Sequence, residues 1–117
     1  ITNIRVIDYD GRLVLSKIDS NKVHSIYVHF PVPWDKKPHR RVISEYFIKE
    51  SIRVLQKDGF LHLRTDSDNY FEYSFNQFMK LNKNQLNIFK NRDLEVTSKY
   101  ESRWKKMEKN IYDIFMI

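Results

Sequence analysis

A short basic segment contains the residue types that most directly suggest chemistry. It carries four cations within six residues, namely Lys36, Lys37, Arg40 and Arg41. Neutralising a phosphate backbone requires such a density of positive charge, and arginine adds a planar donor fork that matches phosphate oxygens. The prolines among residues 31–41 stiffen the backbone, so less entropy is lost when the cations are held in place. The segment is therefore a candidate phosphate-binding loop, and a solvated basic loop is the alternative.

Two other side chains of this loop have both a structural and a functional interpretation. Trp34 can stack on a nucleic-acid base or fill the core, and its size favours the core. His39 can act as a base or bind phosphate, although a lone loop histidine more often does neither. The histidines are scattered along the chain without the spacing of metal ligands, so we expect no metal site.

Carboxylates follow two further predicted strands. The first group is Asp8-Tyr9-Asp10, and the second is Thr65-Asp66-Ser67-Asp68-Asn69-Tyr70. An acid at a strand end can accept hydrogen bonds from an amino or hydroxyl group of a ligand. A turn explains the first group equally well, and helix capping is the stronger explanation of the second. Residues 97–106 mix cations with two aromatic rings and one acid, which fits either a solvated face or a binding surface.

The surrounding pattern predicts an α/β layered sheet that positions these segments. Strands are expected at Ile4–Ile7, Ser25–Phe30, Phe60–Thr65 and Ile111–Ile117, and a weaker one at Leu94–Val96. One helix is expected from the N-cap Ser44 to Asp58-Gly59, and a second carries Tyr70, Phe71, Phe75, Phe78 and Met79. Periodicity does not decide between helix and strand for Leu13–Ile18. The polar segments follow strand ends, so they are expected on one rim of the sheet, where ligands of such folds bind.

Composition excludes several classes of protein. The 117 residues carry a net charge of +6 and no cysteine, which suits one small domain without disulfides, thiolate zinc sites or a cysteine nucleophile. The two glycines cannot form a glycine-rich nucleotide loop. No apolar run approaches the length of a membrane span. The positive charge favours a polyanionic partner only weakly.

Residues 30–41 resemble a sequence block of a known family. They read F-P-V-P-W-D-K-K-P-H-R-R and are similar to the F-P-D-P-W-x-K-x-x-H-x-K-R-R block of bacterial tRNA (guanine-N7-)-methyltransferases. Other blocks agree in order and spacing. Residues 60–66 resemble the family's strand ending in T-D, 98–101 its T-K-F-E block, 111–114 its closing W-D-L strand, and 3–11 its N-L-R-V…D-A stretch. The resemblance covers nearly the whole chain.

The resemblance implies a Rossmann-like sheet that uses S-adenosylmethionine and methylates guanine N7 in the tRNA variable loop. The partners would be tRNA and the cofactor, in the cytoplasm and without a membrane. Monomer and homodimer both remain open. Carried over residue by residue, Asp10 matches the acid near the cofactor adenine, and Asp66 is a substrate-binding aspartate and the catalytic candidate. The substrate and tRNA contacts would come from Lys36, Pro38, His39, Arg40, Arg41, Ser98, Lys99, Tyr100 and Glu101.

Four departures separate this chain from the family pattern. Val32 stands where the family has its proposed catalytic aspartate, and valine can neither accept a hydrogen bond nor carry charge. Asp35 lies three residues further on as a possible substitute. Two residues are missing between His39 and Arg40. Ser98 replaces threonine and keeps the hydroxyl, and Tyr112 replaces tryptophan.

The family's glycine-rich first strand and ribose-binding acid have no counterpart in residues 1–117, and the chain begins with Ile1. We therefore expect the C-terminal part of a single methyltransferase domain, in which the strand at Ile4 lacks a neighbour leading to the strand at Ile26. The leading hypothesis is the tRNA-substrate half of such an enzyme. The alternatives are a non-catalytic basic RNA-binding module derived from that fold, which Val32 favours, and an unrelated α/β domain.

Overall fold

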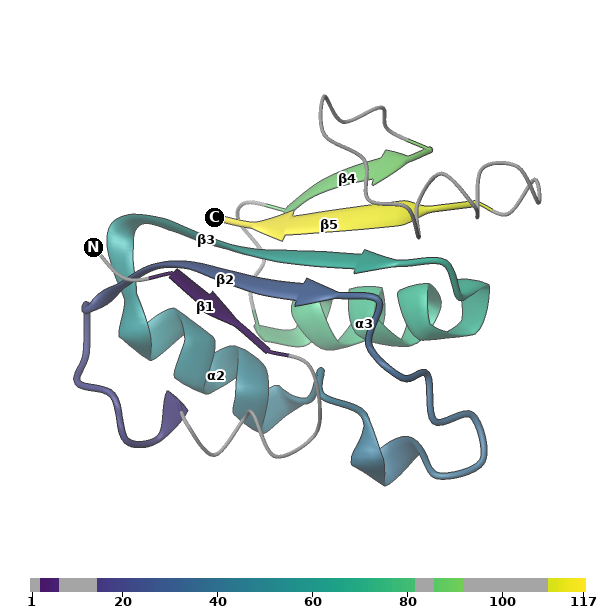
Figure 1. Cartoon of the computed structure of the whole chain (residues 1–117), viewed down its shortest axis with the longest axis horizontal. Helices are drawn as coiled ribbons and strands as arrows, with labels where there is room; N and C mark the ends of the chain where they lie inside the picture. Colours follow the sequence, from purple (N-terminus) through teal and green to yellow (C-terminus); the bar gives the residue numbers. More distant parts are fainter. Residues whose placement is uncertain (1–2, 7–14, 82–85, 92–109) are drawn as a thin grey trace.

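The computed structural model describes residues 3–6, 15–81, 86–91 and 110–117. In chain order, the described elements are β1 (Asn3–Arg5), β2 (Val23–His29), the 3₁₀ turn η1 (Pro38–Arg40), α2 (Glu45–Val54), β3 (Leu55–Thr65), α3 (Asp68–Leu81), β4 (Leu86–Lys90) and β5 (Tyr112–Met116) (Figure 1). None of the helices in these ranges is long and apolar enough to cross a membrane.

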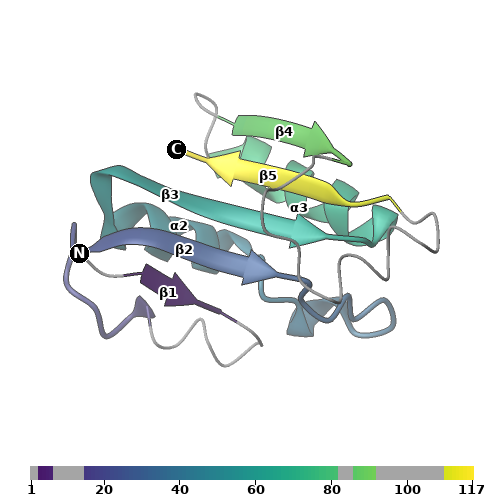
Figure 2. The ribbon, with the colours of Figure 1, turned by 45° about the horizontal axis from the view of Figure 1, so that its top comes forward.

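The strands form one mixed sheet in the order β1-β2-β3-β5-β4. The first three strands are parallel, and β5 runs antiparallel to both of its neighbours. Parallel strands bring their carboxyl ends to the same edge of the sheet, which we call the rim. The helices α2 and α3 both lie on one face of the sheet (Figures 1 and 2). The predicted α/β layered sheet is thereby confirmed.

The core lies between the sheet and these helices. Strand alternation sends Ile26 and Val28 of β2 and Leu61 and Leu63 of β3 to the helical face, because side chains of a strand point alternately to opposite faces. Their helical partners in the same cluster of buried side chains include Phe47, Ile48, Tyr70 and Phe78. The helices thereby cover the apolar face of the strands, and this packing holds the rim in place.

Helix α2 begins as the sequence predicts but ends earlier. The Ser44 hydroxyl accepts a hydrogen bond from the Phe47 amide at 3.1 Å, which confirms the N-cap. The predicted end at Asp58-Gly59 is wrong, because Leu55 already has extended backbone angles and begins β3. Gly59 serves a different purpose, since a Cβ there would lie 2.5 Å from the His24 carbonyl oxygen. The glycine permits a close approach of β2 and β3 where their register shifts.

The expectation that the strand at Ile4 lacks a neighbour is also wrong. β1 pairs directly with β2, with Ile4 opposite Ile26, and the Val6 amide donates to the Tyr27 carbonyl at 2.8 Å. Pairing satisfies backbone groups that a solitary strand would leave without partners.

Helix α3 confirms most of the second predicted helix. Tyr70 and Phe78 are buried, with Phe71 and Phe75 packed against the core. Met79 is 43% exposed, so its predicted place on the apolar face is wrong. Strand β4 was not predicted, because most of its side chains are exposed and it lacks an alternating pattern.

Candidate functional site

Two of the predicted rim segments meet in the structure. The loop of residues 30–43 follows β2, and residues 66–68 follow β3 at the same edge of the sheet (Figure 1). The Phe30 amide donates to the Arg64 carbonyl at 2.7 Å, which ties the start of the loop to the end of β3. The Asn69 side-chain amide in the first turn of α3 donates to Asp35 Oδ1 at 2.9 Å. The basic loop and the segment that contains Asp66 are thus parts of one surface.

Arg41 anchors the basic loop from inside. Its side chain is only 5% exposed. The Nε atom donates to the Pro33 carbonyl at 2.7 Å, and Nη2 lies 3.3 Å from Asp35 Oδ1. The guanidinium carbon also lies 4.5 Å from the centre of the Tyr73 ring, a cation–π distance. The guanidinium expected to contact tRNA therefore has its partners within the loop and α3.

Two tyrosines of α3 hold the backbone just after Arg41. The Ile43 amide donates to the Tyr70 hydroxyl at 3.3 Å, and the Tyr73 hydroxyl donates to the Ile43 carbonyl at 2.8 Å. Burial raises the pKa of both phenols. Both hydroxyls therefore stay protonated at neutral pH, and Tyr73 keeps the proton that it donates.

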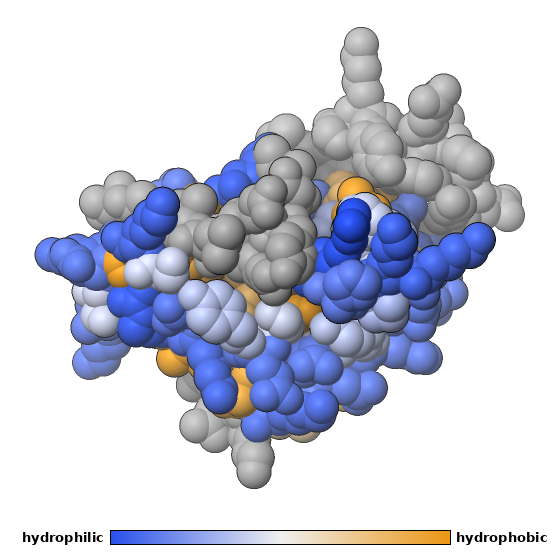
Figure 3. Space-filling view, turned by 90° about the horizontal axis from the view of Figure 1, so that it is seen from below, coloured by the Kyte–Doolittle hydropathy of each residue, from blue (hydrophilic) through white to orange (hydrophobic). Residues whose placement is uncertain are grey.

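The other cations of the loop face solvent. Lys36, Lys37 and Arg40 are exposed, as are Pro38 and His39 in η1. The face that includes this part of the chain, seen from below in Figure 3, is predominantly hydrophilic. This arrangement leaves three positive charges available to an anionic partner.

Trp34 does not occupy the core position that its size favours. It is half-buried and has a backbone φ of 48°. The Arg40 guanidinium carbon lies 5.2 Å from the centre of its ring. The indole and the exposed cation therefore stack on each other at the loop surface, where a base could also stack.

The segment after β3 caps α3 without using Asp66. Thr65 Oγ1 accepts from the Ser67 amide at 3.2 Å, and Ser67 Oγ accepts from the Tyr70 amide at 3.1 Å. The Asp68 carboxylate accepts from the Tyr112 hydroxyl, and this hydrogen bond raises the pKa of Tyr112. Asp66 is partly exposed, so its carboxylate can face a ligand at the rim. Val32, which the sequence resemblance aligns with a family aspartate, is 52% exposed.

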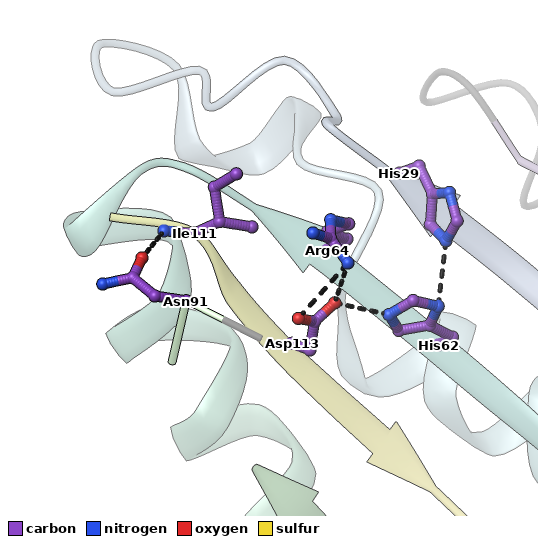
Figure 4. Close-up of polar contacts among 6 residues, drawn as sticks. All are labelled: His29, His62, Arg64, Asn91, Ile111 and Asp113. Carbon is purple, nitrogen blue, oxygen red and sulfur yellow. Dashed lines mark hydrogen bonds and ion pairs between the residues drawn. The ribbon is translucent and has the colours of Figure 1, made fainter. Parts of the chain in front are cut away.

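A polar cluster lies beside the rim, on the sheet face opposite the helices (Figure 4). Asp113 Oδ1 lies 2.6 Å from His62 Nε2 and 3.1 Å from Arg64 Nη1. His62 Nδ1 in turn lies 2.9 Å from His29 Nε2. Arg64 and Asp113 are fully buried, whereas His29 is partly exposed. A hydrogen-bonded chain thus runs from a buried ion pair on β3 and β5 to an accessible imidazole at the end of β2.

The sequence pattern did not reveal this cluster, although two signals were present. His62 and Arg64 alternate with Leu61 and Leu63, which places both polar groups on the face away from the core. The antiparallel register then sets Asp113 beside Arg64. The histidines lack the spacing of metal ligands, so the sequence did not single them out. The described residues contain no group of three or more side chains that could hold a metal ion.

Acidification is expected to destabilise the fold through His29. Burial, followed by the electrostatic effects of His62, Arg5 and Arg64, lowers the pKa of His29 from 6.5 to about 4. Between these values the unfolded chain binds a proton that the folded chain refuses, so the unfolding free energy falls as pH drops from 6.5 towards 4. Above pH 6.5 the effect vanishes. Urea denaturation of the wild type and of His29→Gln at several pH values in this range would measure this loss of stability. If the unfolding free energies of the two proteins fell equally with pH, the expectation would be contradicted.

Several predicted residues lie outside the described ranges. These are Asp10 and the Asp8–Gly11 segment, Leu94–Val96, and the block Ser98, Lys99, Tyr100 and Glu101, together with part of Leu13–Ile18.

A cavity of about 680 Å³ lies at the other edge of the sheet, lined by Leu55, Gly59, Leu81 and Met116 among others. The described rim offers cations, an indole and a carboxylate rather than a glycine-rich turn. It does not by itself fit S-adenosylmethionine.

Comparison with known proteins identifies the family of the chain. A family model described as "Putative methyltransferase" matches residues 1–114. A tRNA (guanine-N(7)-)-methyltransferase of Campylobacter jejuni strain RM1221 is 52% identical over 99% of this chain, and that of Wolinella succinogenes is 47% identical over the same share. The protein of the same name from Helicobacter pylori strain 26695 is 47% identical over 97%. The chain spans about 30% of the length of these relatives. Because the model described as "Putative methyltransferase" matches almost all of this chain, the chain belongs to the methyltransferase family that the model describes.

Proposed function

We propose that this chain forms the tRNA-binding part of an enzyme that methylates guanine N7 in the tRNA variable loop. The observation that carries the proposal is the anchored basic loop, whose exposed Lys36, Lys37 and Arg40 lie on the same rim as Asp66. The names of the relatives support the same reaction. In this proposal the chain is the C-terminal part of a single methyltransferase domain, and the protein acts in the cytoplasm, where tRNA is found.

The chemistry of guanine N7 suits such a site. N7 carries a free lone pair, so no proton has to be removed before the methyl group is transferred. Catalysis can then depend on positioning and electrostatics rather than on a strong base. The loop cations would bind phosphates, the Trp34 ring would offer a stacking surface, and Asp66 would accept hydrogen bonds from the N–H edge of the guanine.

The methyl donor in this proposal is S-adenosylmethionine, which supplies an electrophilic methyl group. The described residues do not form its site, and Asp10, which we assign to its adenine, lies outside them. We therefore assign only substrate binding to the described residues.

Arg40→Ala is expected to weaken tRNA binding to a similar extent across tRNA sequences. Losing one phosphate contact should lower the slope of log affinity against log salt by about one unit. The exposed Lys57 at the start of β3, on the opposite edge, provides a matched control. Filter binding at several salt concentrations should show a reduced slope for Arg40→Ala and an unchanged slope for Lys57→Ala. Equal slopes for both variants would remove Arg40 from the interface.

Transfer of a radiolabelled methyl group to unmodified tRNA tests the function itself. The full-length protein should label guanine N7 in the variable loop, and nuclease mapping of the product would identify the base. Comparison with residues 1–117 alone would show whether these residues suffice. No transfer by the full-length protein would overturn the enzymatic proposal.

A non-catalytic RNA-binding module is the second candidate, and Val32 favours it. This exposed valine occupies the position of a family aspartate on the rim. A full-length protein that binds tRNA without methylating it, and gains transfer on Val32→Asp, would support this candidate. Rapid transfer by the wild type would exclude it.

A further inference from the structure

The Asp113–His62–His29 chain has one buried end and one accessible end. The His29 side chain comes from the carboxyl end of β2, and the other groups come from β3 and β5. Figure 4 shows one ring nitrogen of His29 directed at His62, whereas the other points away from the cluster. Because His29 is partly exposed, this second nitrogen, Nδ1, is the candidate for contact with a ligand.

Charge balance within the cluster bears on the protonation of His29. Asp113 already has Arg64 as its cationic partner, with Nη1 at 3.1 and 3.4 Å from its two oxygens. A third charge would leave the buried cluster with a net positive charge, which is costly in a site of low dielectric. The groups that act on His29 are Arg5 from β1, Tyr27 from its own strand, His62 and Arg64 from β3, and Asp113 from β5. The two cations among them also disfavour a charged His29, and the opposite effect of Asp113 is weaker, so we take His29 as neutral.

With His62 neutral as well, the hydrogen-bonded chain can be satisfied in one direction only. The carboxylate of Asp113 accepts and cannot donate, so His62 Nε2 carries the proton that lies between them. His62 Nδ1 is then an acceptor, and His29 Nε2 must donate to it. His29 Nδ1 is consequently left without a proton. The buried carboxylate thereby fixes the tautomer of a ring two hydrogen bonds away, as second-shell groups do for metal-bound histidines.

We propose that His29 Nδ1 accepts a hydrogen bond from the 2-amino group of the target guanine, with His62 and Asp113 as positioning residues. This inference rests on the proposed function. β2 and β3 are adjacent parallel strands, so their ends lie about 5 Å apart, and Asp66 directly follows β3. The two Asp66 oxygens can accept from N1–H and from one hydrogen of the amino group. The second amino hydrogen requires one further acceptor, and a neutral ring nitrogen provides it.

The tautomer can be measured without any activity. In ¹⁵N NMR spectra of the full-length protein at neutral pH, His29 and His62 should both carry their proton on Nε2. In the Asp113→Asn variant, the proton distribution on both rings should change. A wild-type His29 protonated at Nδ1, or on both nitrogens, would overturn the inference even if the enzyme methylates tRNA.

The contact itself can be measured with a tRNA transcript that carries inosine at the target position. Inosine lacks the 2-amino group and keeps N7. The wild type should prefer guanosine in kcat/KM, and His29→Gln should reduce that preference about three- to tenfold, the usual range for one neutral hydrogen bond. Glutamine retains a donor for His62, so the fold should persist, and its acceptor is an amide oxygen that does not occupy the position of Nδ1. His24→Gln is the matched control at the other end of β2 and should leave the preference unchanged.

The outcomes separate this inference from the proposed function. Unchanged discrimination in His29→Gln, with normal methylation of guanosine, would overturn the role of His29 and leave the enzymatic proposal standing. A full-length protein without methyl transfer would overturn both, although the tautomer would still be measurable. An equal loss on both transcripts would place His29 in folding or general docking and would also overturn the inference.

Discussion

Asp113→Ala is expected to lower the free energy of unfolding by about 3–5 kcal/mol, the usual cost of removing one partner from a buried ion pair. The variant leaves the fully buried Arg64 without its carboxylate and removes the acceptor for His62 Nε2. Both groups are then desolvated with less compensation. Urea denaturation at neutral pH would measure the loss.

A double replacement provides the control for this result. Arg64→Met combined with Asp113→Leu removes both charges and fills a similar volume, so it should be less destabilising than Asp113→Ala alone. If Asp113→Ala lowers the free energy of unfolding by less than about 1 kcal/mol, the ion pair is more accessible to solvent than its burial indicates.

Arg41→Ala should cost about 2–3 kcal/mol in stability and also weaken tRNA binding. The stability is lost with the Nε bond to Pro33 and the contact with the Tyr73 ring, since hydrogen bonds from charged groups and cation–π contacts contribute at this level. Binding weakens because the exposed loop cations are no longer held in place. The stability and tRNA affinity of Arg41→Lys should lie between those of the wild type and Arg41→Ala, since lysine keeps the charge but lacks the planar donor fork.

The salt dependence of binding distinguishes anchoring from direct contact. Arg41 is buried, so Arg41→Ala should lower tRNA affinity at every salt concentration without changing the slope. Arg40→Ala should change the slope instead. A slope reduced by about one unit in Arg41→Ala would mean that Arg41 reaches a phosphate in the complex and that the anchoring role is wrong.

Local patterns predicted the fold where each signal was self-contained. The Ser44 cap, the strand β2 that ends before Pro31 and Pro33, and the aromatic spacing of α3 are properties of a few neighbouring residues. The end of α2 was predicted wrongly because the sequence Asp58-Gly59 is typical of a helix end. In the structure, Gly59 instead allows β3 to approach the His24 carbonyl of β2 closely. The pairing of β1 failed for a similar reason, since strand neighbours depend on the whole sheet.

The candidate site shows the same division. The density of cations in the loop was visible in the sequence, and the exposure of Lys36, Lys37 and Arg40 agrees with it. Their division into exposed side chains and one buried anchor was not visible, because Arg41 acquires its role from Tyr73 on α3. The histidine cluster requires the register of three strands, which no spacing along the chain conveys.

Gly59 acts as a register clamp for the central strand. Because Gly59 has no side chain, its backbone can lie against the His24 carbonyl in the observed register of β3 and β2. The far end of β3, six residues on, lies about 20 Å away and carries Arg64 and the approach to Asp66. A slip of one residue would turn His62 and Arg64 towards the core and Leu61 and Leu63 away from it. A hydrogen atom in place of a side chain at Gly59 thus permits the alignment of chemical groups at the opposite edge of the sheet.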